Sequence, residues 1–145
     1  MRELARAPRV QRLVFGSIDL QLDLGISGDG EELLLFRSQL VLASRLAPPV
    51  DGVSTAIGDT DQLQADTRRA RRLGFGAKLC IHPKQVDAVN AGFSPMAEEI
   101  AWARRVRDAA AQAGGAAVAV DGKMIDRPVI LRAEALLRQA ASHAA

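Results

Sequence analysis

Apolar and polar residues alternate along this chain in a pattern that predicts an α/β fold. Three short apolar runs, at residues 13–15, 50–57 and 77–81, are typical of buried parallel strands. Amphipathic segments with helical spacing separate and follow them. Helices are predicted over residues 31–47, 60–73, 83–93, 94–113 and 129–141, with a further short strand over 116–120. Three strands alternating with helices indicate parallel β/α units.

The helix predicted over residues 31–47 carries apolar side chains on more than one face. Leu33, Phe36 and Leu40 follow helical spacing on one side. Four further leucines lie elsewhere on its surface, namely Leu34, Leu35, Leu42 and Leu46. This breadth indicates burial by more than one neighbour. The neighbour is either part of the same fold, or an oligomer partner or a missing segment.

The charge balance argues against a nucleic-acid partner. The 145 residues include 19 Lys and Arg and 17 Asp and Glu, giving a net charge of +2 with the two signs interspersed. The most basic run is Arg68, Arg69, Arg71 and Arg72. Because Asp61 and Asp66 precede these arginines in helical register, we interpret the run as a solvated helix face rather than a phosphate site.

Cysteine content and hydropathy bear on the compartment. Cys80 is the only cysteine, which excludes an intramolecular disulfide and favours a reducing compartment. Its neighbours Leu79 and Ile81 predict that it is a buried small hydrophobe. No apolar run approaches the roughly 18 residues that span a bilayer, and residues 1–12 lack the hydrophobic segment of a signal peptide. We expect a cytoplasmic protein that does not bind membranes.

Candidate chemistry begins with Asp19, the first charged side chain after the apolar run 13–15. A carboxylate just past the carboxyl end of a parallel strand lies where α/β proteins bind ligands and metals, although Asp is also a common turn former. Lys78 and Lys123 are alternative Schiff-base nucleophiles, or else exposed or salt-bridged lysines. His82 is either an acid/base or a structural group at a strand end. Asp126, from its position before Pro128, predicts a helix cap.

Four segments in this order and spacing resemble the citrate lyase beta-subunit-like branch of the HpcH/HpaI aldolase/citrate lyase family. They are Phe15-Gly16-Ser17-Ile18-Asp19-Leu20 with Asp23-Leu24-Gly25; Asp51-Gly52-Val53 with residues 59–63; residues 74–78 with Ile81-His82-Pro83-Lys84-Gln85; and residues 121–128. The resemblance covers nearly everything from residue 13 to 140.

The resemblance implies a fold and a division of the chain. It implies the C-terminal part of a (β/α)8 TIM barrel of the phosphoenolpyruvate/pyruvate-binding type, followed by a C-terminal helical extension. Residues 1–93 would form the last three β/α units and residues 94–145 the extension or lid. Since a TIM barrel takes about 250 residues, we expect the chain to begin inside a domain. An upstream Arg and a second metal-binding Glu of the family would then lie outside it.

The resemblance also implies an activity and residue roles. The family makes or breaks carbon–carbon bonds in acyl-CoA thioesters such as citryl-, malyl- or citramalyl-CoA, using Mg2+. Asp19 would be one of two metal-binding carboxylates, and Gly16, Ser17 and Ile18 would bind substrate. Asp126 would be the catalytic acid/base at the acetyl methyl carbon.

A single carboxylate is a poor Mg2+ site, which leaves alternatives open. We expect the chain alone to bind Mg2+ weakly and to turn over little unless a homo-oligomer or a complementing barrel fragment supplies the rest. The chain would otherwise be a non-catalytic truncated fragment or assembly subunit of such a lyase. A pyruvate-type aldolase of the same superfamily is the other alternative.

Overall fold

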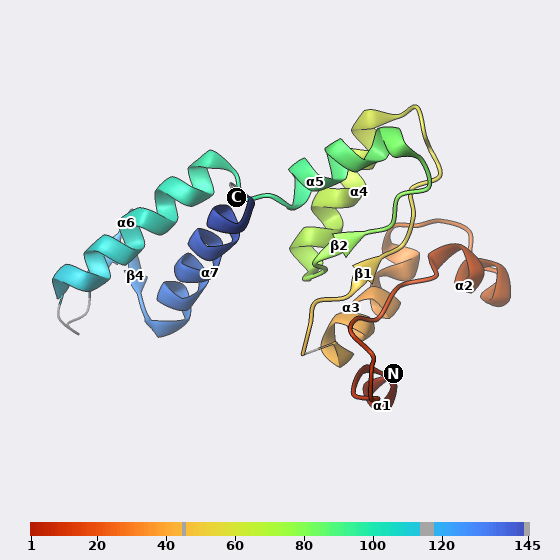
Figure 1. The fold of residues 1–145 in the computed structure, drawn as a ribbon, viewed down its shortest axis with the longest axis horizontal. Coiled ribbons are helices and arrows are strands. Elements are labelled where there is room, and N and C mark those ends of the chain that lie inside the picture. The colour runs from red at the N-terminus through yellow and green to blue at the C-terminus, as the bar shows by residue number, and fades with distance from the viewer. Residues whose placement is uncertain (45, 114–117, 144–145) are drawn as a thin grey trace. The chain divides into compact units, whose positions relative to one another are not determined.

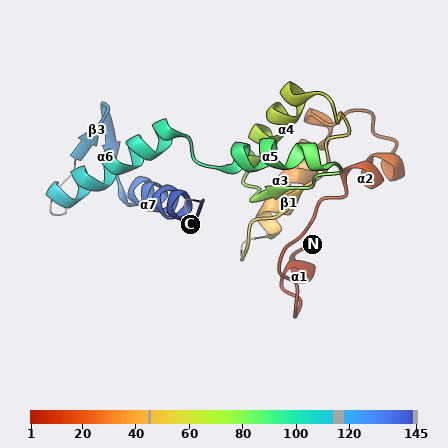
Figure 2. The same ribbon diagram turned by 45° about the horizontal axis from the view of Figure 1, so that its top comes forward.

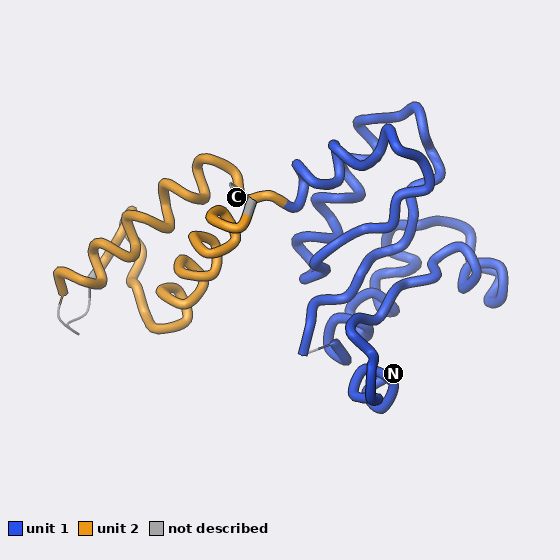
Figure 3. The backbone as a smooth tube through the Cα atoms, viewed as in Figure 1, with its two compact units in different colours: residues 1–93 blue, residues 94–145 orange. Residues whose placement is uncertain are grey.

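The computed structural model describes residues 1–44, 46–113 and 118–143 and divides the chain into two compact units, Met1–Phe93 and Ser94–Ala145 (Figure 3). Unit 1 contains α1 (Arg2–Ala5), α2 (Ser17–Leu24), the 3-10 turn η1 (Glu31–Leu33), α3 (Leu34–Ala43), β1 (Val50–Asp51), α4 (Thr60–Leu73), β2 (Ala77–Lys78), the 3-10 turn η2 (Pro83–Gln85) and α5 (Val86–Phe93) (Figure 1). Unit 2 contains α6 (Ala97–Ala113), β3 (Val118–Val120), β4 (Lys123–Ile125) and α7 (Arg127–His143).

A small parallel sheet organises unit 1. Strands β1 and β2 pair in parallel, with Val50 opposite Ala77 and Asp51 opposite Lys78. The predicted strand at 13–15 is present only as a single parallel bridge between Val14 and Val50, although backbone hydrogen bonds flank that bridge on both sides. The α/β class is therefore confirmed, with strands shorter than predicted.

Strands β1 and β2 end early because the Gln85 side chain takes the place of backbone hydrogen bonds between them. The last backbone bond between them runs from the Leu79 amide to the Asp51 carbonyl, at 3.0 Å. Beyond it, the buried Gln85 amide donates to the Ser54 carbonyl at 2.9 Å and accepts from the Ile81 amide at 2.9 Å. Gln85 thus satisfies backbone groups that the predicted strands 50–57 and 77–81 would have paired with each other.

Helix α4 follows its local signals closely. It runs from Thr60 to Leu73; the Asp59 carboxylate accepts a hydrogen bond from the Gln62 amide at 2.9 Å, and Gly74 ends the helix in the left-handed conformation. Its buried face contains Leu63, Asp66, Thr67 and Ala70. Helices α4 and α5 lie side by side in both ribbon views (Figures 1 and 2).

The helix predicted over residues 31–47 is shorter than expected. It begins as η1, continues as α3 and ends at Ala43. Leu33 and Leu40 are buried as predicted, and Arg37 lies with them on the buried side. The leucines that the sequence places elsewhere remain exposed in this chain, with Leu35 and Leu42 at 63% and Leu46 at 83%.

Nine side chains form the core of unit 1: Leu13, Phe15, Leu33, Leu40, Leu63, Ala70, Phe75, Val89 and Phe93. This core draws on the strand-like segment 13–15 and on both the α3 and α4–α5 sides. On α2, which follows residue 15, Leu20 packs against this core, whereas Ile18, Leu22 and Leu24 are exposed.

Unit 2 is a helical pair with a β-hairpin. Strands β3 and β4 are antiparallel, and Asp121 and Gly122, both with positive φ, form the turn between them. Figure 2 shows α6 and α7 side by side. Ala103, Val106, Ile125 and Ala133 form its core. The sequence analysis missed β4, and its predicted helix end at Gly114 and strand start at 116 lie outside the described residues.

No helix within the described ranges is both long and apolar enough to cross a membrane.

Candidate functional site

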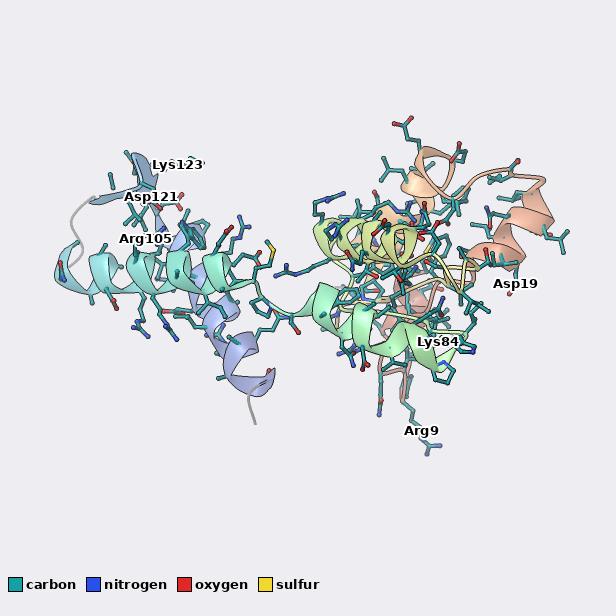
Figure 4. The ribbon with its side chains drawn as sticks, turned by 90° about the horizontal axis from the view of Figure 1, so that it is seen from above. Arg9, Asp19, Lys84, Arg105, Asp121 and Lys123 are labelled. Atoms are coloured by element: carbon teal, nitrogen blue, oxygen red, sulfur yellow. The ribbon has the colours of Figure 1, made fainter. Side chains whose placement is uncertain are left out.

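Asp19 lies in the first turn of α2, not in a loop as predicted. The helix starts at Ser17, immediately after the segment that pairs with β1, so Asp19 still emerges beyond the carboxyl end of the sheet. Its side chain is exposed, and no hydrogen bond or ion pair engages the carboxylate anywhere in the described part of the chain. Figure 4 labels this side chain on α2. The carboxylate is therefore free to bind a cation.

The amino end of α2 has no side-chain cap. Gly16 occupies the capping position, and a Cβ built there would lie 3.3 Å from Asp19 Oδ2. The first amides of a helix lack intrahelical acceptors and carry the positive end of the helix dipole, so an anionic group can bind there. Gly16 and Ile18 are exposed, whereas Ser17 is buried. The Ser17 hydroxyl has no hydrogen-bond partner.

A buried ionic cluster, which the sequence analysis missed, lies at the end of β1. Arg37 is fully buried; its Nε donates to Asp51 Oδ1 at 2.9 Å, while its other nitrogens donate to the Asp29 carbonyl at 2.8 Å and carboxylate at 2.7 Å. Burial alone lowers the pKa of Arg37, but the Asp29 and Asp51 interactions outweigh it and raise the pKa overall. The cluster ties the loop after α2 to the end of β1.

Lys78 extends the cluster on β2. Its ammonium donates to the Gly52 carbonyl at 2.7 Å and lies 3.8 Å from Asp51 Oδ2. Burial lowers the pKa of Lys78, and the charge of Asp51 offsets part of this effect. The side chain is fully buried, so the amine is occupied by backbone and carboxylate partners rather than offered to a keto acid. Lys123, the other Schiff-base alternative, is exposed on β4 (Figure 4).

The arginine run on α4 is a solvated face only in part. Arg68 is exposed, as predicted, and donates a hydrogen bond to the Gln64 side chain. Arg69 is partly buried and pairs with Asp29 at 2.6 Å and with Asp66 at 3.3 Å. Asp29 thereby bridges α4 and the Arg37 cluster. Spacing along α4 could not show this contact, because Asp29 lies 40 residues earlier in the chain.

Two other sequence expectations concern residues just after β2. His82 Nδ1 accepts a hydrogen bond from the Lys84 amide at 3.2 Å, which caps η2 and gives His82 the structural role at a strand end. Cys80 is exposed, so the prediction that it is a buried hydrophobe is wrong. The reason is that β2 ends at Lys78. Residues 79–81 therefore lie beyond the paired strand, and within the described residues no strands cover them on both sides.

In unit 2, Asp126 caps the last helix. Its carboxylate accepts from the Val129 amide at 3.2 Å, directly before α7 begins, and the side chain is exposed. Unit 2 also contains a groove of about 460 Å³ whose lining includes Trp102, Lys123 and Ile125 but not Asp126. Arg132 covers the Trp102 ring with its guanidinium carbon 5.6 Å from the ring centre. Asp19 and Asp126 belong to different units.

The described residues contain no group of three or more His, Cys, Asp and Glu side chains arranged to hold a metal. Asp19 has the free, exposed carboxylate oxygens that a hard cation such as Mg2+ prefers, and so does Asp23 one turn later on α2. Asp19 fits the role of one ligand, and the described residues do not complete a set of three around it.

Fold and site together define an α/β protein of parallel β/α units, with its candidate ligand site at the carboxyl end of the strands. Comparison with known proteins identifies the family: the HpcH/HpaI aldolase/citrate lyase model matches residues 1–83, and the chain belongs to that family.

Relatives match across both units. A citrate lyase subunit beta-like protein of Deinococcus radiodurans is 40% identical over 143 residues, covering 94% of this chain and 50% of the relative. A (3S)-malyl-CoA thioesterase of Cereibacter sphaeroides is 36% identical over 151 residues, covering 99% of this chain and 53% of the relative. The crystal structure of CitE from Mycobacterium tuberculosis, in complex with magnesium, acetoacetate and coenzyme A, matches with a TM-score of 0.85 and 34% identity. That match covers 97% of this chain and 55% of CitE. The chain thus spans about half the length of these relatives.

Proposed function

We propose that this chain carries part of the site of a Mg2+-dependent carbon–carbon lyase that acts on a β-hydroxyacyl-CoA such as citryl-, malyl- or citramalyl-CoA. In this proposal unit 1 supplies the last three β/α units of a (β/α)8 barrel, and unit 2 is its C-terminal extension or lid. Family membership and the CitE complex with magnesium and coenzyme A support the proposal. The observation that carries it is the free Asp19 carboxylate beside the uncapped amino end of α2.

Each residue has a defined task in this proposal. Asp19 contributes one carboxylate to Mg2+, which when bound stabilises negative charge on substrate oxygens. Gly16, Ser17 and Ile18 hold the anionic end of the substrate through the free amides of the first turn of α2. Asp126 takes a proton from the acetyl methyl carbon in the condensing direction and returns it in the cleaving direction.

The test is cleavage of malyl-, citramalyl- and citryl-CoA by the purified chain with Mg2+, followed by release of free acid and acetyl-CoA. Because the chain carries only part of the site, we expect turnover where another copy or a barrel fragment completes it; that turnover should disappear with EDTA and in Asp19→Ala, and fall strongly in Asp126→Asn. Asp126→Asn keeps a side-chain oxygen that can cap α7, so it separates proton transfer from helix capping. Full turnover in Asp126→Asn would remove Asp126 from the proposed mechanism.

A second candidate is an assembly subunit whose site is completed by another copy or by a complementing barrel fragment. Two observations favour it. Asp19 belongs to no group of three or more metal-binding side chains in the described residues, and α3 exposes Leu35 and Leu42. Light scattering coupled to size-exclusion chromatography tests this candidate, because a monodisperse monomer with full turnover contradicts it.

A further inference from the structure

Gly52 lies where no side chain fits. It follows β1 and is buried, and a Cβ built on it would overlap the Ser17 hydroxyl oxygen, lie 2.9 Å from Ser17 Cβ and 3.1 Å from the Phe15 carbonyl oxygen. Its backbone is outside the left-handed region. Close approach of the chain, rather than backbone conformation, therefore requires glycine at this position.

Gly52 cannot easily move away from Ser17. The Lys78 ammonium holds its carbonyl at 2.7 Å, and the preceding Asp51 is held by Arg37 at 2.9 Å. On either side of β1, the Phe15 amide donates to the Val50 carbonyl and the Leu79 amide donates to the Asp51 carbonyl, at 2.9 and 3.0 Å. Arg37, Asp51 and Lys78 are all buried, so this support is rigid.

Ser17, unlike Gly52, is not held in place by hydrogen bonds of its side chain. It begins α2, and its buried hydroxyl has no hydrogen-bond partner to hold it. An added methyl group at position 52 would therefore be accommodated by a shift of Ser17. Residues in one helical turn move together, so that shift would reach Asp19, two residues later, and the free amides of the turn.

We propose that Gly52 is a positioning residue: its close contact with Ser17 sets the first turn of α2 and thereby the direction of the Asp19 carboxylate. This inference rests on the proposed function, in which Asp19 is a metal ligand. Residues that orient a metal ligand without touching the metal typically change affinity by roughly 10–100-fold when mutated. We expect Gly52→Ala to weaken metal binding within that range.

The experiment uses the full 145-residue chain labelled with 15N, and Mn2+ as a paramagnetic probe for a hard divalent cation. Without metal, Gly52→Ala is expected to shift the amide resonances of residues 16–20. In the Mn2+ titration, Gly52→Ala should raise by roughly 10–100-fold the Mn2+ concentration at which those resonances are half-broadened. Gly58→Ala is the matched control, because nothing lies within 4 Å of a Cβ at Gly58 and its φ is not positive. The control should change neither readout.

A rescue variant tests the contact itself. Ser17→Gly in the Gly52→Ala background removes the two atoms that lie closest to the new methyl group and leaves only the Phe15 carbonyl oxygen at 3.1 Å, so it should return the resonances of residues 18–20 toward their original positions. If Gly52→Ala alone does not fold, the double variant should fold. A double variant that stays unfolded, or a folded Gly52→Ala protein with unchanged resonances at residues 16–20, overturns the inference.

A different result would contradict the proposed function but not the role of Gly52. If Asp19→Ala leaves Mn2+ broadening near residues 16–20 unchanged, Asp19 is not the metal ligand. The metal-free resonances of Gly52→Ala, compared with those of Gly58→Ala, still decide whether Gly52 positions α2.

Discussion

Replacement of Arg37 by methionine tests the buried cluster directly. Arg37 is completely buried, donates three hydrogen bonds to Asp29 and Asp51, and places its guanidinium carbon 5.3 Å from the centre of the Phe15 ring. Methionine preserves much of the apolar length of the side chain but none of its donors. The change leaves Asp51, which is also fully buried, without its main partner.

The magnitude follows from the charge left behind. Breaking a buried ion pair by removing one partner typically costs about 3–5 kcal/mol. Lys78 remains 3.8 Å from Asp51 and Asp29 remains paired with Arg69, so we expect the lower end, about 3 kcal/mol. This is a large part of the 5–15 kcal/mol that is typical of a whole domain.

Urea unfolding monitored by far-ultraviolet circular dichroism measures the loss. With a denaturant dependence of about 1–3 kcal/mol per molar urea, a loss of about 3 kcal/mol lowers the midpoint by roughly 1–3 M. Trp102 lies on α6, so its fluorescence reports on unit 2, and hydrogen exchange of peptides covering residues 34–51 reports on unit 1. Arg68→Met is the matched control, because Arg68 is exposed on α4.

Two results distinguish the charge argument from simple loss of packing. Arg37→Met combined with Asp51→Asn and Lys78→Met removes both the carboxylate that lost its partner and the buried ammonium 3.8 Å from it, and should be more stable than Arg37→Met alone by about 1 kcal/mol or more. If Arg37→Met costs no more than Arg68→Met, which should stay within about 0.5 kcal/mol of the unmodified chain, the reasoning is refuted.

Three further predictions use the same unfolding assay. Asp59→Ala removes the carboxylate that caps α4 through the Gln62 amide and should cost about 0.5–2 kcal/mol; an unchanged midpoint would show that the cap contributes nothing. Leu33→Ala should cost about 2–5 kcal/mol because Leu33 is fully buried, whereas Leu42→Ala, at an exposed position, should stay within about 0.5 kcal/mol; equal losses would contradict the assigned burial. Because burial lowers the pKa of Lys78 in the folded chain, the unfolded chain binds more protons between that lowered pKa and the ordinary lysine pKa. The unfolding free energy of the unmodified chain should therefore rise with pH in that alkaline window relative to Lys78→Met, and a constant difference between the two would argue against the lowered pKa.

The candidate site was predictable only where local chemistry signals it. Asp19 could be selected because an apolar run and Gly16 precede it, and Asp126 could be assigned as a helix cap from its position before Pro128. The family motifs added their expected roles. The helix around Asp19 was missed because residues 17–24 carry apolar side chains on several sides and are short for a helix, so their pattern is weak.

The buried cluster was not predictable from spacing. An arginine in the middle of a leucine-rich helix, such as Arg37, is normally expected to face water, because burying a charge is costly unless it is paired. Its partners Asp29 and Asp51 lie 8 and 14 residues away on other elements. Only folding brings those carboxylates to it.

The sequence by itself determined the features that depend on neighbouring residues: the alternation of strands and helices, the start of α4 at a cap on Asp59 or Thr60, its end at Gly74, and the motifs that carry the family resemblance. Tertiary structure alone decided how far the strands extend, where Arg37 and Lys78 lie, and that Gly52 must approach Ser17 without a side chain. The physical reason is that caps and turns are satisfied within a few residues, whereas buried charges and close backbone contacts depend on groups that only the fold brings together.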